Sequence, residues 1–277
     1  MDDETYDLLS NLALPNVHLL QLRVLETDEL KRVKPSRTKG EYCWTLTPFT
    51  PRFVFEADSS VSRVTYLDAD VWLRKKTDAI FIEFEASKKH VLITDHGYAP
   101  EHDQSASSGQ YCVQFMTFTR AGEVVRKWWE LRCIEWCFAR HEDGKFGDQK
   151  YLDDWPERFA NQVHVLDNKE LVMAPWNATR FPYGNSVLWH FHGLRLFRKW
   201  GGQLAANLGA YPIPEPAINY VYRSYIDDLR EAVDMLSKKN RVITSQVEMT
   251  ALVRMKAMLR GLVDQLWRIR NHRVLRL

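Results

Sequence analysis

The sequence predicts an α/β protein in which helices flank a mixed β-sheet and a helical extension follows at the C-terminus. Short apolar, β-branched runs alternate with longer amphipathic segments, an alternation that is typical of α/β domains. The chain has 277 residues, 45% of them hydrophobic, which is enough for one large core or two modest ones. We expect the α/β domain to occupy residues 1–200 and the extension residues 201–277.

The N-terminal part is expected to be largely helical. Its patterns predict, in order, a helix over 3–12, a short strand over 17–22, a mobile loop over 31–40 and an aromatic-rich helix over 41–56. The first helix follows from leucines at helical spacing behind an acidic first turn. The loop follows from Pro35 within a basic cluster, and Pro48 and Pro51 should interrupt the last helix.

The middle of the chain supplies most of the predicted sheet. Its patterns predict, in order, a buried strand over 63–72, an apolar turn over 79–84, a buried strand over 90–94, a Ser-rich loop over 100–109, a strand over 111–118 and an amphipathic helix over 123–140. The apolar face of this helix should consist of Val124, Val125, Trp128, Leu131, Cys133, Ile134, Trp136 and Cys137.

The remaining elements alternate in the same way. The patterns predict a helix beginning within 147–153, a strand over 163–166, a loop over 174–177, a final strand over 187–193 and an amphipathic helix over 226–236. Asp148 lies in the first turn of the first of these helices, where an aspartate often caps the helix. Both a capping role and a chemical role are open for this residue.

Composition excludes several classes of protein. The 38 basic and 36 acidic residues leave a net charge of +2, which argues against a general nucleic-acid binder. The four cysteines include no Cys-x-x-Cys pair, so a reducing compartment fits better than a disulfide framework. No apolar run approaches the roughly 20 residues that span a bilayer, and residues 2–4 are acidic, unlike a signal peptide. We expect a cytoplasmic protein, soluble or peripheral on the inner face of the membrane.

The strand predicted over 63–72 carries two carboxylates, Asp68 and Asp70, at its end. Burying a carboxylate without a cation or a hydrogen-bond donor costs roughly several kcal/mol of free energy. A bound metal ion would supply the counter-charge. A solvated loop is the ordinary alternative, because aspartate commonly ends strands. His190 and His192 are two positions apart on the last predicted strand and therefore share a face, as metal ligands or as satisfied core residues.

Three motifs occur in a fixed order: Tyr66-Leu67-Asp68-Ala69-Asp70, Gly147-Asp148-Gln149 and His190-Phe191-His192-Gly193. Together they resemble the metal site, the Asp-Gln helix start and the closing His-x-x-Gly of the retaining glycosyltransferases of family 8, including relatives that modify bacterial surface polysaccharide. The combination is far more specific than any one motif, and the resemblance covers residues 1–200.

The resemblance implies an A-type, Rossmann-like glycosyltransferase fold that transfers a hexose from a nucleotide-sugar, a UDP-sugar above all, to a glycan or lipid-linked acceptor. Asp68, Asp70 and His190 match the metal ligands, and this mixed set favours Mn²⁺ over Mg²⁺. Asp148 and Gln149 match the positions that face the anomeric carbon, where they would stabilise an oxocarbenium-like centre. The positions expected to contact the nucleotide-sugar or the acceptor are Tyr42, Asp95, His96, Trp176, Asn177, Gly193 and Arg195.

The chain departs from the family in three places. Cys112-Val113 stands where an Asn-Ala pair often contacts the sugar, so the donor sugar is expected to differ. The family's Lys-Pro-Trp is missing, and Arg195, Arg198 and Lys199 lie in the same region, where one of them is expected to supply the phosphate contact. In the family, a strand and a helix that hold the uridine precede the segment matching residues 2–6, so we expect a misassigned start or a natural truncation.

The C-terminal segment 254–277 is basic. It carries seven basic residues against Asp264 alone, a net charge of +6, with an apolar stripe that ends at Trp267. A helix of this kind could lie in an anionic leaflet, or pack on the body of the protein with its basic face in solvent.

Two other functions compete with glycosyl transfer. A haloacid-dehalogenase-type phosphatase also uses a strand ending in Asp-x-Asp, a later strand ending in a threonine such as Thr94, and acids placed like Asp148 and Asp153. The other competitor is a non-catalytic relative that kept the sheet and lost the nucleotide pocket.

Overall fold

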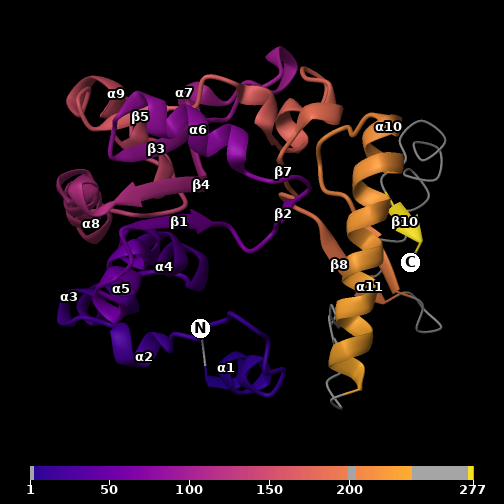
Figure 1. Cartoon of the computed structure of the whole chain (residues 1–277), viewed down its shortest axis with the longest axis horizontal. Coiled ribbons are helices and arrows are strands. Elements are labelled where there is room, and N and C mark those ends of the chain that lie inside the picture. Colours follow the sequence, from indigo (N-terminus) through magenta and orange to yellow (C-terminus); the bar gives the residue numbers. More distant parts are fainter. Residues whose placement is uncertain (1–2, 199–203, 239–273, 277) are drawn as a thin grey trace. The chain divides into compact units, whose positions relative to one another are not determined.

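The computed structural model describes residues 3–198, 204–238 and 274–276, which fold as helices with two mixed β-sheets and one antiparallel sheet (Figure 1). The predicted α/β class, with sheets flanked by helices, is confirmed. Two compact units divide the chain. The first unit comprises Met1–Leu67, Glu83–Asp95 and Gln104–Leu166, and the second comprises Asp68–Ile82, His96–Asp103 and Asp167–Leu277. The boundary predicted at residue 200 falls outside the described residues and stays a prediction.

The first unit is built on a four-stranded mixed sheet. Its strands are β1 (Arg63–Leu67), β4 (Tyr111–Thr119), β3 (Val91–Asp95) and β5 (Val163–Val165), in that spatial order. β4 is antiparallel to both of its neighbours, and β5 is parallel to β3. β3 is buried along its whole length, as its continuous apolar run predicted. β1 is not the buried strand that was expected, because both of its end residues are exposed and it stops at Leu67.

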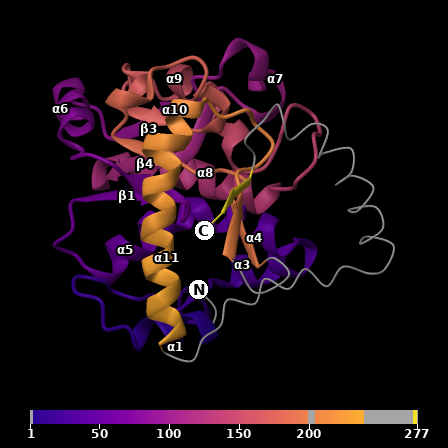
Figure 2. The same cartoon turned by 90° about the vertical axis from the view of Figure 1, so that its right-hand side faces the viewer.

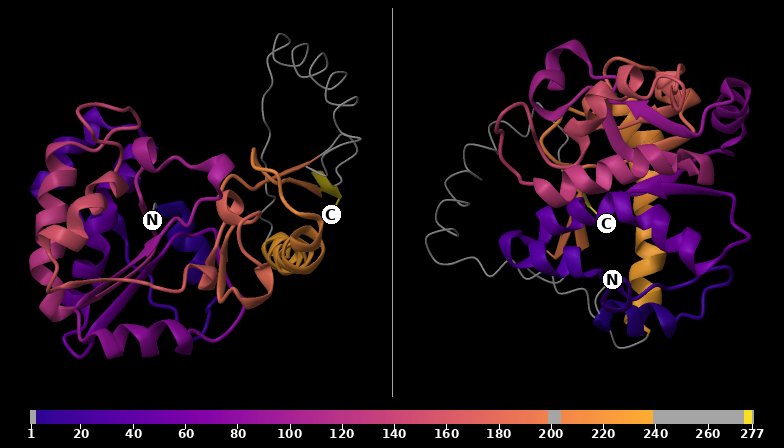
Figure 3. Two further views of the ribbon diagram at one scale, coloured as in Figure 1. Left: turned by 90° about the horizontal axis from the view of Figure 1, so that it is seen from above. Right: turned by 90° about the vertical axis from the view of Figure 1, so that its left-hand side faces the viewer.

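The N-terminal part of the first unit is helical almost throughout. It contains α1 (Asp3–Ser10), α2 (Leu22–Leu25), α3 (Asp28–Val33), α4 (Lys39–Leu46) and α5 (Thr50–Ala57), joined by the short turns η1 (Lys34–Ser36) and η2 (Thr47–Phe49). The last three helices, indigo in Figure 3, pack around Leu30, Tyr42, Phe49 and Phe53. The predicted strand over 17–22 and the predicted loop over 31–40 are wrong. Thr27 caps α3, and Thr38 forms a capping box with Glu41 that starts α4.

Two more predictions in the middle of the chain need correction. The apolar run over 79–84 lies within a helix, α6 (Asp78–Ser87), in which Ile80 and Phe84 are buried four positions apart while Ile82 is exposed. The Ser-rich stretch over 100–109 contains two short helical turns, η3 (Pro100–His102) and α7 (Ser105–Ser108). The other short elements of this region and the next are η4 (Arg120–Gly122), η5 (Gln149–Asp154), α9 (Trp155–Arg158), η6 (Lys169–Leu171), η7 (Pro175–Asn177) and η8 (Tyr183–Asn185).

The helix predicted over 123–140 is α8 (Glu123–Glu135), which ends five residues earlier than expected. Its buried face includes Val125, Trp129 and Cys133, which pack in the core of the first unit. Two residues assigned to that face, Val124 and Leu131, are more than half exposed. The apolar stripe is therefore narrower than predicted, because Arg126 and Glu130 share the buried face.

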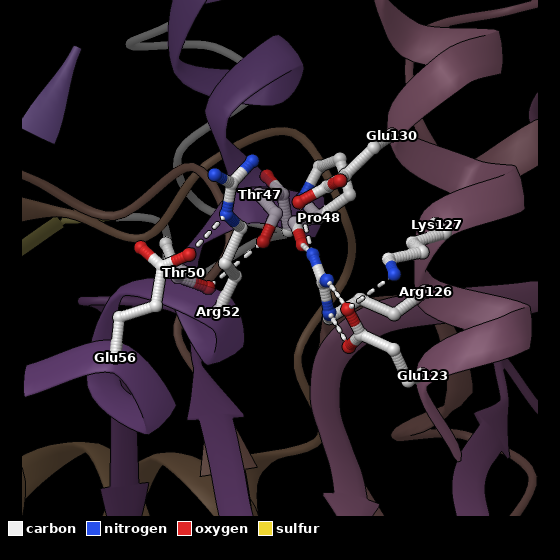
Figure 4. Close-up of polar contacts among 9 residues, drawn as sticks. All are labelled: Thr47, Pro48, Thr50, Arg52, Glu56, Glu123, Arg126, Lys127 and Glu130. Carbon is white, nitrogen blue, oxygen red and sulfur yellow. Dashed lines mark hydrogen bonds and ion pairs between the residues drawn. The ribbon is translucent and has the colours of Figure 1, made fainter. Parts of the chain in front are cut away.

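Arg126 is the most deeply buried charge on α8 (Figure 4). Its guanidinium donates to both carboxylate oxygens of Glu123, to Glu130 and to the carbonyl of Pro48 in η2. Desolvation raises the pKa of Glu130, and the charge of Arg126 offsets this only in part. The hydrogen bond to Pro48 ties α8 to η2, and the three charged residues of α8 compensate one another.

Replacing Arg126 by methionine should lower the free energy of unfolding by about 3 kcal/mol, because Glu130 would lose its buried counter-charge. Urea unfolding measures the loss, and the double variant Arg126→Met/Glu130→Leu should recover most of it. Arg52→Met is the matched control, since it breaks the more exposed ion pair with Glu56 and should cost less than about 1 kcal/mol. Equal losses for the two arginine variants would contradict this interpretation.

The second unit contains two small sheets. The first has the order β2 (Val71–Leu73), β7 (Leu188–His190) and β6 (Val172–Met173), with β2 antiparallel and β6 parallel to β7. The second is antiparallel, with the order β10 (Val274–Arg276), β9 (Leu204–Asn207) and β8 (Arg195–Arg198). The strand predicted over 187–193 ends at His190 and is not the last, since β8, β9 and β10 follow it.

A long helix covers part of this unit. α10 (Glu215–Ala217) and the π-helical turn η9 (Ile218–Tyr222) lead into α11 (Arg223–Ser237), which confirms the helix predicted over 226–236. α11 runs beside β8 and β9 (Figure 1 and Figure 2), and its Ile226 packs in one cluster with Ala206 and Leu208. The basic segment 254–277 lies outside the described residues, apart from β10. Among the helices that the structure describes, none is long and apolar enough to cross a membrane.

Candidate metal centre and surrounding residues

The pairing of β2 with β7 brings Asp70 next to His190. Val71 lies opposite His190 in this antiparallel ladder, and the backbone N–H of Phe191 donates to the carbonyl of Asp70 at 2.8 Å. Asp70 therefore ends the turn that enters β2, at the same edge where His190 ends β7. Residues 120 positions apart in the sequence are held together by backbone hydrogen bonds.

Asp68, Asp70 and His190 form a compact group of metal-binding side chains, which we call the metal trio. Their ligand atoms all lie within 4.8 Å of one another. His190 Nε2 is 3.0 Å from Asp70 Oδ1 and 3.8 Å from Asp68 Oδ2. His190 is buried and the two aspartates are half-buried. The structure thus brings together the three residues that the sequence predicted as ligands, and metal binding by them stays a prediction.

The chemistry of the trio suits a divalent cation. Two carboxylates and one imidazole match the ligands that Mn²⁺ accepts, and three protein ligands leave positions for a substrate. Burial raises the pKa of Asp70, but the hydrogen bond and the charge of His190 outweigh it, so the pKa lies below its usual value. The carboxylate that a metal needs is therefore present at neutral pH.

Trp176 packs beside the metal trio. Its ring is edge-on to those of His190 and His192, with centroids at 5.4 and 5.5 Å, and its Nε1 donates to the carbonyl of His96 at 2.8 Å. His96 in turn stacks on Tyr98, with 4.6 Å between ring centroids. Trp176 and His96 are nearly fully buried and form one aromatic cluster with His190, and contact of either residue with a nucleotide-sugar stays a prediction.

Asn177 is fully buried, and both ends of its amide bind the backbone. Its Oδ1 accepts from the N–H of Ala174 at 2.8 Å, and its Nδ2 donates to the carbonyls of His96 and Val172 at 3.0 and 3.3 Å. These bonds fix the turn η7 against two other segments of the second unit. Contact of Asn177 with a nucleotide-sugar stays a prediction.

Replacing Asn177 by alanine should lower the free energy of unfolding by about 2 to 4 kcal/mol, because buried backbone groups would lose their partners. Asn177→Asp should also be destabilising, since a carboxylate keeps the acceptor for Ala174 and loses both donors. Denaturant unfolding tests both variants. Asn168→Ala is the control, because that exposed asparagine makes one capping bond to Glu170 and should cost about 1 kcal/mol at most.

The backbone turns sharply after the trio at Gly193. Its φ of +79° favours glycine, and the Cα of Gly209 lies 3.7 Å from where a Cβ would be. Arg195 follows at the start of β8, where it is exposed and donates to the carbonyl of Leu194. The phosphate-binding role expected of Arg195 stays a prediction, as does that of Arg198 and Lys199, whose side chains lie outside the described residues.

The other predicted site residues belong to the first unit. Asp148 is buried and precedes η5, but its side chain makes no capping hydrogen bond, so the capping interpretation is wrong. Its carbonyl accepts from Trp129 Nε1 at 2.8 Å, and the neighbouring Gln149 donates through Nε2 to the carbonyl of Ser108 at 2.8 Å. A chemical role of the Asp148 carboxylate stays a prediction.

Asp95 and Tyr42 also lie in the first unit, and each is bonded to another side chain. Asp95 ends the buried strand β3 and accepts from Gln110 Nε2. The hydroxyl of Tyr42 donates to Glu26 at 2.7 Å within the N-terminal helices. Sugar or nucleotide contact by either residue stays a prediction.

Comparisons with known proteins return similar chains without an established role. No protein-family model matches the chain. It is 29% identical over 216 residues to the uncharacterized protein YfnF of Bacillus subtilis (strain 168), covering 71% of both chains. It is 27% identical over 251 residues to the uncharacterized protein YfnD of the same organism, covering 84% of this chain and 79% of that one.

Two solved structures are similar at low identity. One is a glycosyltransferase involved in the glycosylation of the major capsid of PBCV-1, with 12% identity and a TM-score of 0.41 over 57% of this chain and 73% of that one. The other is the apo form of mouse xyloside xylosyltransferase 1, with 13% identity and a TM-score of 0.46 over 69% of this chain and 82% of that one. Both TM-scores are too low to assign a fold or an activity to this chain.

Proposed function

We propose that this protein is a metal-dependent glycosyltransferase with an A-type fold, which transfers a hexose from a nucleotide-sugar, most favourably a UDP-sugar, to a glycan or lipid-linked acceptor. The observation that carries the proposal is the metal trio, Asp68, Asp70 and His190, whose ligand atoms lie within 4.8 Å of one another. The order of the Asp-x-Asp, Asp-Gln and His-x-x-Gly motifs supports it.

In this proposal the trio holds Mn²⁺ or Mg²⁺ beside the diphosphate of the donor. A bound divalent cation would neutralise the negative charge that grows on the diphosphate as the glycosidic bond breaks. The pKa of Asp70 lies below its usual value, so Asp70 would supply a negatively charged ligand for that cation, and His190 would bind the cation as a neutral imidazole.

Asp148 and Gln149 are the proposed groups on the sugar side. The anomeric carbon gains positive charge as the leaving group departs, and a buried carboxylate stabilises that charge more strongly than an exposed one. Transfer with retention of the anomeric configuration is part of the proposal, as is the assignment of Asp148 as the stabilising carboxylate and of Gln149 as the amide beside it.

A panel of nucleotide-sugars with Mn²⁺ tests the proposal. We expect hydrolysis or transfer for at least one UDP-sugar, measured as UDP release, and loss of that activity with EDTA. Para-nitrophenyl phosphate in the same buffer tests for the alternative phosphatase. Phosphate release from that compound without turnover of any nucleotide-sugar would favour the phosphatase over the glycosyltransferase. Activity with neither class of substrate would favour the non-catalytic relative.

A further inference from the structure

Two aromatic residues lie within two positions of members of the metal trio. Trp72 lies two residues after Asp70 on β2, and Phe191 directly follows His190 at the end of β7. Their rings pack against each other at 6.3 Å between centroids. These two side chains therefore pack beside the start of β2, which follows Asp70, and the end of β7, where His190 lies.

Tyr225 of α11 packs against both of these aromatic rings. It stacks on Phe191 with 3.8 Å between centroids and 10° between planes, and it lies 5.8 Å from Trp72. Three residues further along the same helix face, Asp228 accepts a hydrogen bond from Trp72 Nε1 at 2.9 Å. One face of α11 thus holds β2 through two separate contacts and holds the end of β7 through a third.

The covered backbone is the one that positions the metal trio. The N–H of Phe191 donates to the carbonyl of Asp70, so a shift of the Phe191 ring would move the backbone of Asp70 with it. Desolvation, together with the charges of Asp70 and Asp228, raises the pKa of Tyr225. Tyr225 is therefore a neutral phenol at physiological pH, and it lies close enough to Asp70 for the negative charge of that carboxylate to act on it.

We propose that Tyr225 is a positioning residue for the metal trio: by stacking on Phe191, and with Asp228 holding Trp72, α11 fixes the separation between Asp70 and His190 that the cation requires. The inference rests on the metal binding in the proposed function and adds a part of the chain outside the three motifs. Groups that orient metal ligands contribute about 10- to 100-fold to metal affinity.

The test is the Kd for Mn²⁺, measured without any substrate by the electron paramagnetic resonance signal of the free ion. Tyr225→Leu should raise the Kd about tenfold, whereas Tyr225→Phe, which keeps the stacked ring, should stay within about twofold. Asp228→Ala should raise it about threefold, and because Asp228 is exposed this variant is expected to fold. Tyr220→Leu is the matched control, since Tyr220 is 67% exposed and stacks on Tyr183 instead.

The outcomes separate the two proposals. If the wild-type protein binds Mn²⁺ no better than Asp70→Asn does, both the metal-dependent function and this inference are wrong. If the wild-type protein binds Mn²⁺ and Tyr225→Leu has the same Kd, with or without a lower Tm, only the inference is overturned. If Tyr225→Leu does not fold, the Kd of Asp228→Ala decides, and an unchanged value again overturns the inference.

Discussion

Asp70→Asn should reduce nucleotide-sugar turnover by about 1,000-fold or more. The substitution keeps the size of the side chain and removes the charge that sits 3.0 Å from His190. Charge stabilisation by a metal ion contributes several kcal/mol to a transition state, and each factor of ten corresponds to about 1.4 kcal/mol. The measurement is kcat/KM for the best donor of the panel, together with the Kd for Mn²⁺, which should rise in parallel.

Asp234→Asn is the matched control for this prediction. Asp234 is an exposed aspartate on α11 in the same unit, so the same change of charge away from the trio should leave kcat/KM within about twofold. A fall in turnover without any change in the Kd for Mn²⁺ would separate Asp70 from the metal. Full activity of Asp70→Asn would remove the metal trio from the proposed mechanism.

Asp148→Asn should lower kcat by about 100- to 1,000-fold, which is the usual effect of removing one buried group aimed at a developing charge. The isosteric amide preserves the packing of the residue, and its backbone carbonyl can still accept the hydrogen bond from Trp129. We expect the Kd for Mn²⁺ to stay within about twofold, because Asp148 is not a member of the metal trio. Rapid-quench measurement of one turnover with saturating donor isolates the chemical step.

Asp143→Asn provides the control in the first unit. Asp143 has a φ of +49°, a conformation that asparagine adopts as readily as aspartate, so the substitution should change neither folding nor kcat. Equal kcat values for Asp148→Asn and Asp143→Asn would show that the carboxylate of Asp148 does not act in the chemical step. The proposed role on the sugar side would then pass to Gln149 or to another residue.

The elements that were predicted well are those in which one local signal dominates. β3 carries a continuous apolar, β-branched run, β4 is rich in apolar and aromatic residues, and α11 has a clear helical period, so burial and periodicity agree. The N-terminal errors arose where capping decided the structure. Thr27 and Thr38 both accept hydrogen bonds from the first turn of a helix, and these bonds start helices in a stretch where Pro35 suggested a loop.

The strands β8 and β9 illustrate a different limit. Ala205 and Ala206 have a strong preference for helices. They nevertheless form a strand, because their backbone pairs with β8 and their side chains are buried in the second unit. Such pairing depends on tertiary contacts that no short window of sequence contains. The same holds for α11, whose position beside β2 and β7 could not be inferred from its period.

For the candidate site, the motifs predicted which residues meet in the metal trio, because the resemblance to family 8 matched all three of them to metal ligands. The motifs did not predict which residues pack around the metal trio and hold its backbone in place. Asn177 donates to the backbone carbonyl of His96, 81 positions away. Every residue has such a carbonyl, so the sequence does not indicate which one a side chain will bind. Tyr98 and Tyr225 were missed for the same reason, since an aromatic residue in a loop or a helix carries no signal of what it stacks upon.

The interleaving of the two units has a consequence for synthesis on the ribosome. Each unit is assembled from three separate stretches of the chain, and β2 leaves the ribosome about 120 residues before its partner β7. At about 5 to 20 residues per second, Asp68 and Asp70 would wait roughly 6 to 24 seconds for His190. The three side chains of the metal trio therefore come together only after residue 190 has been synthesised.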